Sequence, residues 1–140
     1  AELAFIVVVG PDPVGVEEGL GLVERLQASG MSIGALIVNR VRLRAEAPDG
    51  LAERLARVDT MRGLPPGEVR AGADALSQTC REQSVLARAD ALQIERLSRA
   101  FPQVIPVPLL ATDVHDLEAL GLVVAQLYRH GDMLNGEAVG

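Results

Sequence analysis

Three short stretches of the chain are apolar at nearly every position. They read "LAFIVVV" at 3–9, "SIGALIVNRV" at 32–41 and "PQVIPVPLL" at 102–110. A strand that is buried on both faces has such a continuous apolar run, and strands of this kind belong to parallel sheets covered by helices. The pattern therefore predicts three parallel strands in sequential order, at 4–9, 35–41 and 103–109.

The segments between these stretches have apolar residues at the spacing of a helix. Between the first two, Val16, Leu20 and Val23 recur every three to four residues, and Gly30 is placed to end that helix. Strand, helix and strand at this length predict a βαβ unit with a right-handed crossover.

The long middle segment carries two further helical patterns. Residues 51–61 are either a short amphipathic helix or a mobile segment. Residues 73–100 contain no internal proline or glycine and predict the longest element of the chain. After the third strand, a last helix is expected over 111–130, with Asp113 as its N-cap and Asp116 three residues further on.

This order predicts an α/β fold, a small three-stranded parallel sheet with helices on both faces and a long helical insert at about 45–100. The first strand is very apolar for the edge of a sheet, where an exposed strand tends to pair with another chain. We therefore expect residues 1–130 to be part of a larger Rossmann-like sheet, followed by a flexible tail at 131–140.

Composition excludes several chemistries. The chain has 140 residues, a net charge of −6 and 13 basic residues, all of them arginine. Without lysine it has neither a Schiff-base amine nor a GxxxxGK[ST] phosphate loop. Its acidic balance disfavours a nucleic-acid-binding surface. A single cysteine, Cys80, excludes an internal disulfide and a thiolate metal cage and fits a cytoplasmic setting.

No catalytic or metal site is predicted. His115 and His130 are about four turns apart on one expected helix, which is too far for them to share a metal ion. No nucleophile with a base and no paired carboxylates are evident. Apolar runs are too short to cross a bilayer, and the start of the chain lacks a basic leader.

The ends of the second and third strands carry the candidate site. Asn39 follows the second strand at the carboxyl edge of the sheet, where ligands of open α/β folds gather. Its amide offers an acceptor and two donors, which match the edge of adenine, and Arg40 could stack on a base or pair with an acid. The alternative is that Asn39 only caps the junction between strand and loop. Asp113 likewise has the alternative role of an ordinary helix cap.

A family resemblance joins these pieces. The segments "FIVVVGPDPVGVEEGLGLVERLQASGMSIGALIVNRV", "QTCREQSVLARADALQIERLSRAFPQVIPVPLL" and "DVHDLEAL" occur in this order. Together they resemble the C-terminal half of the ArsA-type anion-transporting ATPases. That family of MinD/ParA-like P-loop NTPases includes arsenite-pump ATPases and the targeting ATPase for tail-anchored membrane proteins. By resemblance, the adenine pocket falls on Asn39 with Arg40 and on Pro108, Leu109, Leu110, Ala111 and Asp113.

The resemblance also implies cofactors and partners. The intact parent would bind ATP and Mg and hydrolyse ATP, whereas this chain would bind neither tightly and would be inactive alone. The expected partners are an N-terminal half that carries the phosphate loop, a membrane-protein partner or cargo of the parent, and a second copy paired along 4–9. One departure is "SQTC", where Ser77 replaces the first cysteine of a zinc-binding CxxC pair and only Cys80 remains.

Two other functions stay open. The chain could be a non-catalytic α/β module that acts by association. It could also be half of a P-loop ligase similar to dethiobiotin synthetase, although the long helical insert argues against that reading.

Overall fold

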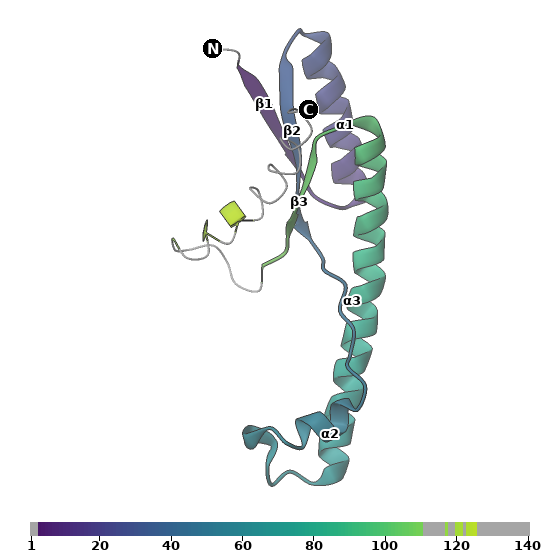
Figure 1. Cartoon of the computed structure of the whole chain (residues 1–140). Coiled ribbons are helices and arrows are strands. Elements are labelled where there is room, and N and C mark those ends of the chain that lie inside the picture. Colours follow the sequence, from purple (N-terminus) through teal and green to yellow (C-terminus); the bar gives the residue numbers. More distant parts are fainter. Residues whose placement is uncertain (1–2, 111–116, 118–119, 122, 126–140) are drawn as a thin grey trace, which may run out of the picture. The chain divides into compact units, whose positions relative to one another are not determined.

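The computed structural model describes residues 3–110, 117, 120–121 and 123–125. Its strands are β1 (Ala4–Val9), β2 (Ser32–Val41) and β3 (Val104–Pro108). They form one parallel sheet in the order β1-β2-β3 (Figure 1). The predicted α/β class, with a three-stranded parallel sheet flanked by helices, is confirmed, and so is the sequential strand order.

The helices are α1 (Pro13–Ala28), α2 (Leu51–Leu55), a 3₁₀ turn η1 (Asp59–Met61) and α3 (Pro66–Ala100). At 35 residues, α3 is the longest element in the described part of the chain, as predicted. It begins at Pro66 rather than near residue 73, because a proline is compatible with the first turn of a helix and has its φ already fixed. The segment 51–61 contains two short helical turns instead of one helix.

The chain divides into two compact units. The first comprises residues 1–41 and 89–140, and the second comprises residues 42–88. The sheet, α1 and the last part of α3 therefore belong to the first unit. The segment with α2, η1 and the earlier part of α3 belongs to the second, where Val69, Ala73 and Ala87 are buried.

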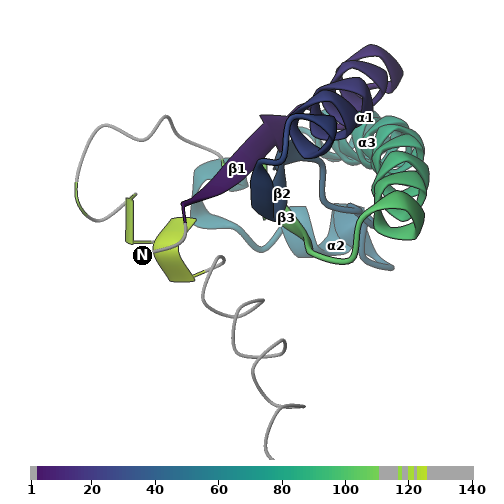
Figure 2. The ribbon, with the colours of Figure 1, turned by 90° about the horizontal axis from the view of Figure 1, so that it is seen from above.

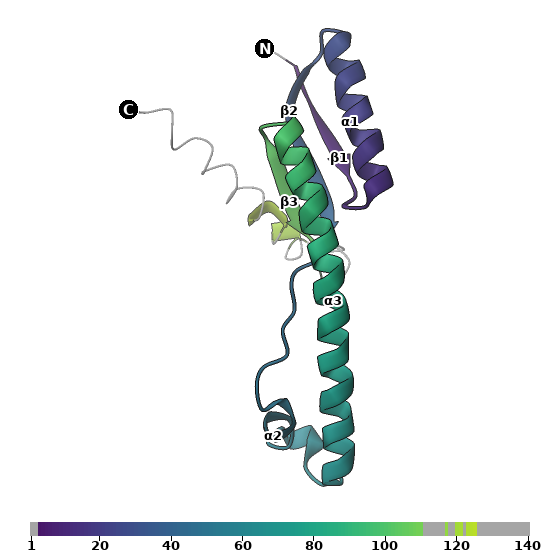
Figure 3. The ribbon, with the colours of Figure 1, turned by 90° about the vertical axis from the view of Figure 1, so that its right-hand side faces the viewer.

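The core of the first unit lies on one face of the sheet. Val7 and Val9 of β1 pair with Leu36 and Val38 of β2, and these four side chains are buried together. α1 covers this face with Val16 and Val23, and the C-terminal end of α3 covers it with Leu97, followed by Phe101 directly after the helix (Figures 2 and 3). Two right-handed crossovers that step in the same direction across a sheet place both helices on the same side.

The opposite face is apolar, and among the described residues no helix covers it at β1, so the helices predicted on both faces are described on one face only. Ile6 and Val8 alternate with the core residues, and their side chains are 61% and 60% exposed. The helix expected at 111–130 lies mostly outside the described residues, although residues 117, 120–121 and 123–125 are helical. Its expected N-cap Asp113 and the expected tail at 131–140 also lie outside them.

α1 has strong signals at both ends. The Asp12 side chain caps its start by accepting a hydrogen bond from the Gly15 N–H at 2.9 Å, and Pro13 occupies the first helical position. At the other end Gly30 has φ +75°, and its N–H donates to the Gln27 carbonyl while that of Met31 donates to Leu26. This is a Schellman motif, and it confirms Gly30 as the helix stop.

Candidate functional site

The carboxyl ends of β2 and β3 meet, as the sequence predicted. Val41 pairs with Pro108, and the Leu109 N–H donates a hydrogen bond to the Val41 carbonyl at 2.8 Å. The structure thereby brings Asn39 and Arg40 to the same edge of the sheet as Pro108 and Leu109. Leu110 follows directly along the chain. Ala111 and Asp113, the other two residues of the expected site, lie outside the described part of the chain.

A β-bulge reshapes β2 at this edge. Val38 pairs with Pro106 and Val41 with Pro108, so β2 uses one residue more than β3 between the two pairs. The additional residue arises at Asn39–Arg40, and Arg40 has φ +63°, in the left-handed region. Bulges redirect side chains and are frequent beside binding sites.

The Asn39 side chain stabilises this backbone. Its Oδ1 accepts a hydrogen bond from the Arg40 N–H at 2.9 Å. Within the described residues this is the one hydrogen bond of that side chain, so both donors of its Nδ2 remain available. The alternative interpretation, in which Asn39 only caps the junction between strand and loop, therefore accounts for the hydrogen bond of its Oδ1 atom. It assigns no role to the Nδ2 donors.

The surface around Asn39 combines polar and apolar groups. Asn39 and Arg40 are exposed, and Leu109 is 48% exposed. Pro108 and Leu110 are half-buried. An amide with free donors, a guanidinium and an apolar side chain at one edge can hydrogen-bond and stack against a flat heterocycle.

The turn after β1 contains a residue whose role the sequence analysis missed. The Asp12 carboxylate accepts a hydrogen bond from the Gly15 N–H in the first turn of α1. A Cβ at Gly10 or Gly15 would lie 2.8 Å or 3.0 Å from Asp12 Oδ2, so both glycines leave room for this side chain. The sequence "PDPVG" already held the signal, since an acidic N-cap followed by proline marks a helix start.

Asp12 also bears on anion binding. The start of a helix attracts phosphate through its free N–H groups and the positive end of the dipole. Here a carboxylate occupies that position and would repel a second anion. This agrees with the absence of a phosphate-loop motif from the sequence.

Other site types find no support in the part of the chain that the structure describes. Within 3–110 and the described residues beyond it, no three histidine, cysteine, aspartate or glutamate side chains are grouped to hold a metal ion. His115 and His130 lie outside these residues. None of the described helices combines the length and the apolar composition that a membrane crossing requires.

The carboxyl edge of the sheet is therefore the site on which the sequence and the structure converge. Comparison with known proteins adds no relative to this description, since no protein-family model matches the chain and no curated protein matches its sequence.

Proposed function

We propose that this chain supplies the adenine side of a nucleotide site, within an ATPase that resembles the ArsA-type family. Asn39 hydrogen-bonds the edge of the base through its Nδ2 group. Arg40 and the segment from Pro108 onward, with Leu109, Leu110, Ala111 and Asp113, surround it. ATP and Mg would bind in the intact protein, whose phosphate loop is carried by another segment.

The observation that supports this proposal best is the bulge at Asn39–Arg40. A left-handed φ at arginine is unfavourable, so the surrounding structure must maintain it. The bulge keeps an asparagine and an arginine exposed at the end of the central strand, whereas regular alternation would turn one of them toward the core. Outliers of this kind cluster at ligand sites.

The phosphate side of the site has no support in this chain. The sequence contains no lysine, and Asp12 places a carboxylate where a phosphate would otherwise meet the start of α1. Phosphoryl transfer depends on positioned positive charge around the γ-phosphate. The chain alone should therefore release no phosphate from ATP in the presence of magnesium.

Amide NMR of the ¹⁵N-labelled chain tests the base site. Titration with adenosine should shift the signals of Asn39, Arg40, Leu109 and Leu110, with an affinity in the millimolar range. Adenosine lacks phosphate, so the experiment isolates the base. Ribose, which lacks a base, should leave these signals unchanged.

A pair of variants decides whether Asn39 acts through its donors. Asn39→Asp removes the Nδ2 donors, keeps an oxygen for the Arg40 N–H, and should abolish the adenosine-dependent shifts. Gln83→Glu makes the same change of charge at an exposed position of α3 and should leave them unchanged. The proposal fails if the adenosine shifts are absent from this edge, or if both variants respond alike.

A second function, association through β1, is favoured by a different observation. Within the described residues β1 pairs only with β2, so its outer edge offers backbone groups to another strand. A groove of about 570 Å³ lies between Val7–Gly10 of β1 and its turn and α1, where its lining includes Glu18, Leu22 and Arg25. We propose that a second copy of the chain, or the segment with the phosphate loop, pairs there.

Sedimentation velocity tests the association. The unmodified chain should form a dimer or larger assembly whose share rises with concentration. Val8→Lys places a charge beside the edge and should shift the chain toward monomer. Leu92→Lys makes the same change at another exposed apolar position, 64% exposed on α3, and should not. A chain that remains monomeric at high micromolar concentration would exclude self-association.

A further inference from the structure

The second unit contains an arginine-lined groove that the proposed nucleotide site does not use. It has a volume of about 550 Å³ and lies between the loop at 44–47 and one face of α3. Three arginines, Arg44, Arg81 and Arg88, line it, together with a single acidic residue, Glu46. We propose that this groove, named here the arginine groove, binds a doubly charged oxyanion of the phosphate type.

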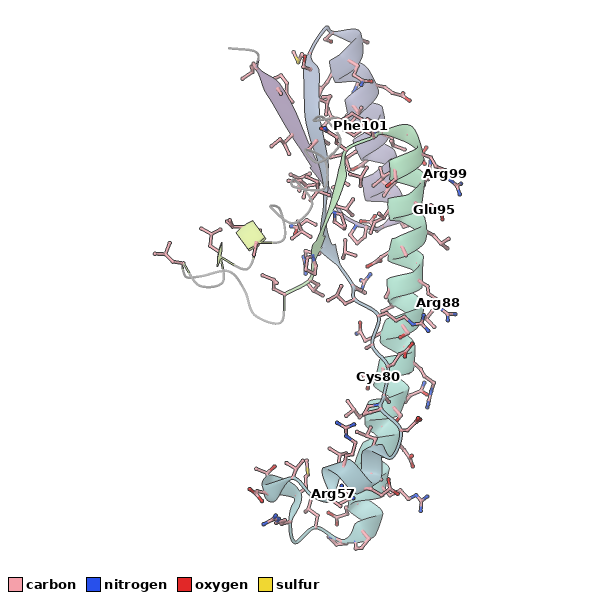
Figure 4. All side chains as sticks on the ribbon, in the orientation of Figure 1. Arg57, Cys80, Arg88, Glu95, Arg99 and Phe101 are labelled. Atoms are coloured by element: carbon pink, nitrogen blue, oxygen red, sulfur yellow. The ribbon has the colours of Figure 1, made fainter. Side chains whose placement is uncertain are left out.

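The groove has a defined wall on α3. Its residues there recur at spacings of three and four, which places them on one face of the helix. Figure 4 labels two of them, Cys80 and Arg88. The full set on α3 is Ser77, Cys80, Arg81, Ser84, Val85 and Arg88.

A hydrogen bond holds the opposite wall in place. The Ser84 hydroxyl, near the middle of the helix face, donates to the carbonyl of Ala45. This contact fixes the loop at 44–47 against α3 and brings Arg44 to the arginines of the helix. The groove is therefore formed by the fold of the second unit itself.

The charge of the groove is positive in an acidic protein. Three arginines and one glutamate give its lining a net charge of +2, whereas the whole chain carries −6. Arg44 is neutralised by Glu46 at 2.8 Å. Arg81 donates to the neutral amide oxygen of Gln78 at 2.8 Å and 3.2 Å, and therefore keeps its full charge.

Arg88 completes the arrangement. No hydrogen bond or ion pair of its side chain is recorded within the described residues. Arg81 and Arg88 are seven residues apart, about 10 Å along the helix. Long arginine side chains can converge over that separation, and guanidinium groups bind phosphate oxygens in bidentate geometry.

The volume and the lining suggest more than a bare ion. Ligand pockets commonly measure about 300–1,000 Å³. Here Ala45, Ala47, Val85 and the Cys80 thiol provide apolar surface beside the arginines. A phosphomonoester with a small apolar body would use both parts, whereas inorganic phosphate would use only the arginines.

Cys80 provides the experiment. It is the single cysteine of the chain and lines the groove, so its rate of alkylation reports occupancy. The reagent is N-ethylmaleimide, which is uncharged, and ionic strength is held constant with sodium chloride. Inorganic phosphate and phenyl phosphate should each slow the reaction in a saturable manner. Stronger protection by phenyl phosphate identifies a phosphomonoester as the ligand class, and equal protection identifies the oxyanion alone.

Matched variants establish which arginines bind the oxyanion. Arg81→Gln and Arg88→Gln should each weaken protection by about tenfold or more, because each removes a charge-assisted contact. Arg57→Gln removes an exposed arginine of the same unit that does not line the groove (Figure 4) and should leave protection unchanged. Circular dichroism of each variant verifies the helix content.

Three results would overturn the proposal. The first is that neither phosphate compound slows alkylation beyond the chloride control. The second is that the protection does not saturate. The third is that all three arginine variants lose protection equally, which would indicate nonspecific attraction. Because the readout involves neither adenosine nor the carboxyl edge of the sheet, its failure and that of the nucleotide proposal are independent.

Discussion

Gly19 of α1 packs directly against Val9 of β1, so closely that a Cβ at Gly19 would lie 2.3 Å from Val9 Cγ1. Both residues are buried. The absence of a side chain at Gly19 therefore sets the distance between the helix and the strand. This contact supports the end of β1 from which the turn to Asp12 departs.

Replacement of Gly19 by alanine should destabilise the protein. An added methyl group must displace Val9 or the helix, and overpacking of this kind costs about 1–3 kcal/mol. Gly21→Ala is the matched control on the same helix, where the nearest atom is the flexible end of Arg25 at 3.4 Å. It should stabilise α1 by up to about 1 kcal/mol. Urea unfolding measures both, and equal effects would contradict the packing.

Asp12→Ala should lower the free energy of unfolding by about 1 kcal/mol, through loss of the N-cap of α1. Asp12→Ser keeps an oxygen for the Gly15 N–H and should recover most of that loss. Thermal unfolding followed by circular dichroism compares the two variants. If alanine and serine have the same effect, the cap contributes nothing to stability.

A substitution series at Arg40 tests the left-handed backbone. At φ +63° glycine is unstrained and asparagine is tolerated, whereas a β-branched side chain is disfavoured. We expect stability in the order Gly, Asn, Arg, Val, with glycine about 1 kcal/mol above arginine. Urea midpoints of the four proteins give the order. A valine variant as stable as the glycine variant would show that residue 40 is not left-handed in solution.

Leu97→Ala should cost about 2–5 kcal/mol, because Leu97 is fully buried against the sheet. Leu92, on the same helix, is 64% exposed, and Leu92→Ala should change stability by less than about 0.5 kcal/mol. Chemical unfolding provides the comparison. Similar losses at both positions would mean that the end of α3 does not pack on the sheet as described.

The sequence predicted the strands well because their composition is unambiguous. β1 occupies Ala4–Val9 as expected, and the expected ends of β2 and β3 are correct to within a few residues. Continuous apolar runs of this length leave few alternatives once helical periods lie between them. The same reasoning located α1 and α3, but it placed the start of α3 near residue 73 instead of at Pro66.

The candidate site was only partly predictable. The position of Asn39, Pro108 and Leu109 at one edge of the sheet followed from parallel strands of sequential order. The bulge was not predicted, although two consecutive polar residues, Asn39 and Arg40, between Val38 and Val41 interrupt strict alternation in the sequence. The arginine groove was missed for another reason: Arg44 and Arg88 are far apart in sequence, and only the fold of the loop at 44–47 brings them together.

The bulge in β2 also changes which side chains are exposed at the edge of the sheet without changing which side chains pack in the core. Leu36, Val38 and Val41 are buried in the core, and the interval from 38 to 41 is odd only because of the additional residue. A chain shortened by one residue at 39 or 40 would return to strict alternation and would still direct Val41 to the core. The additional residue is therefore dispensable for hydrophobic packing, and its effect falls on the exposed edge. Proteins that share this fold but have no ligand at the edge are accordingly expected to be one residue shorter at this point.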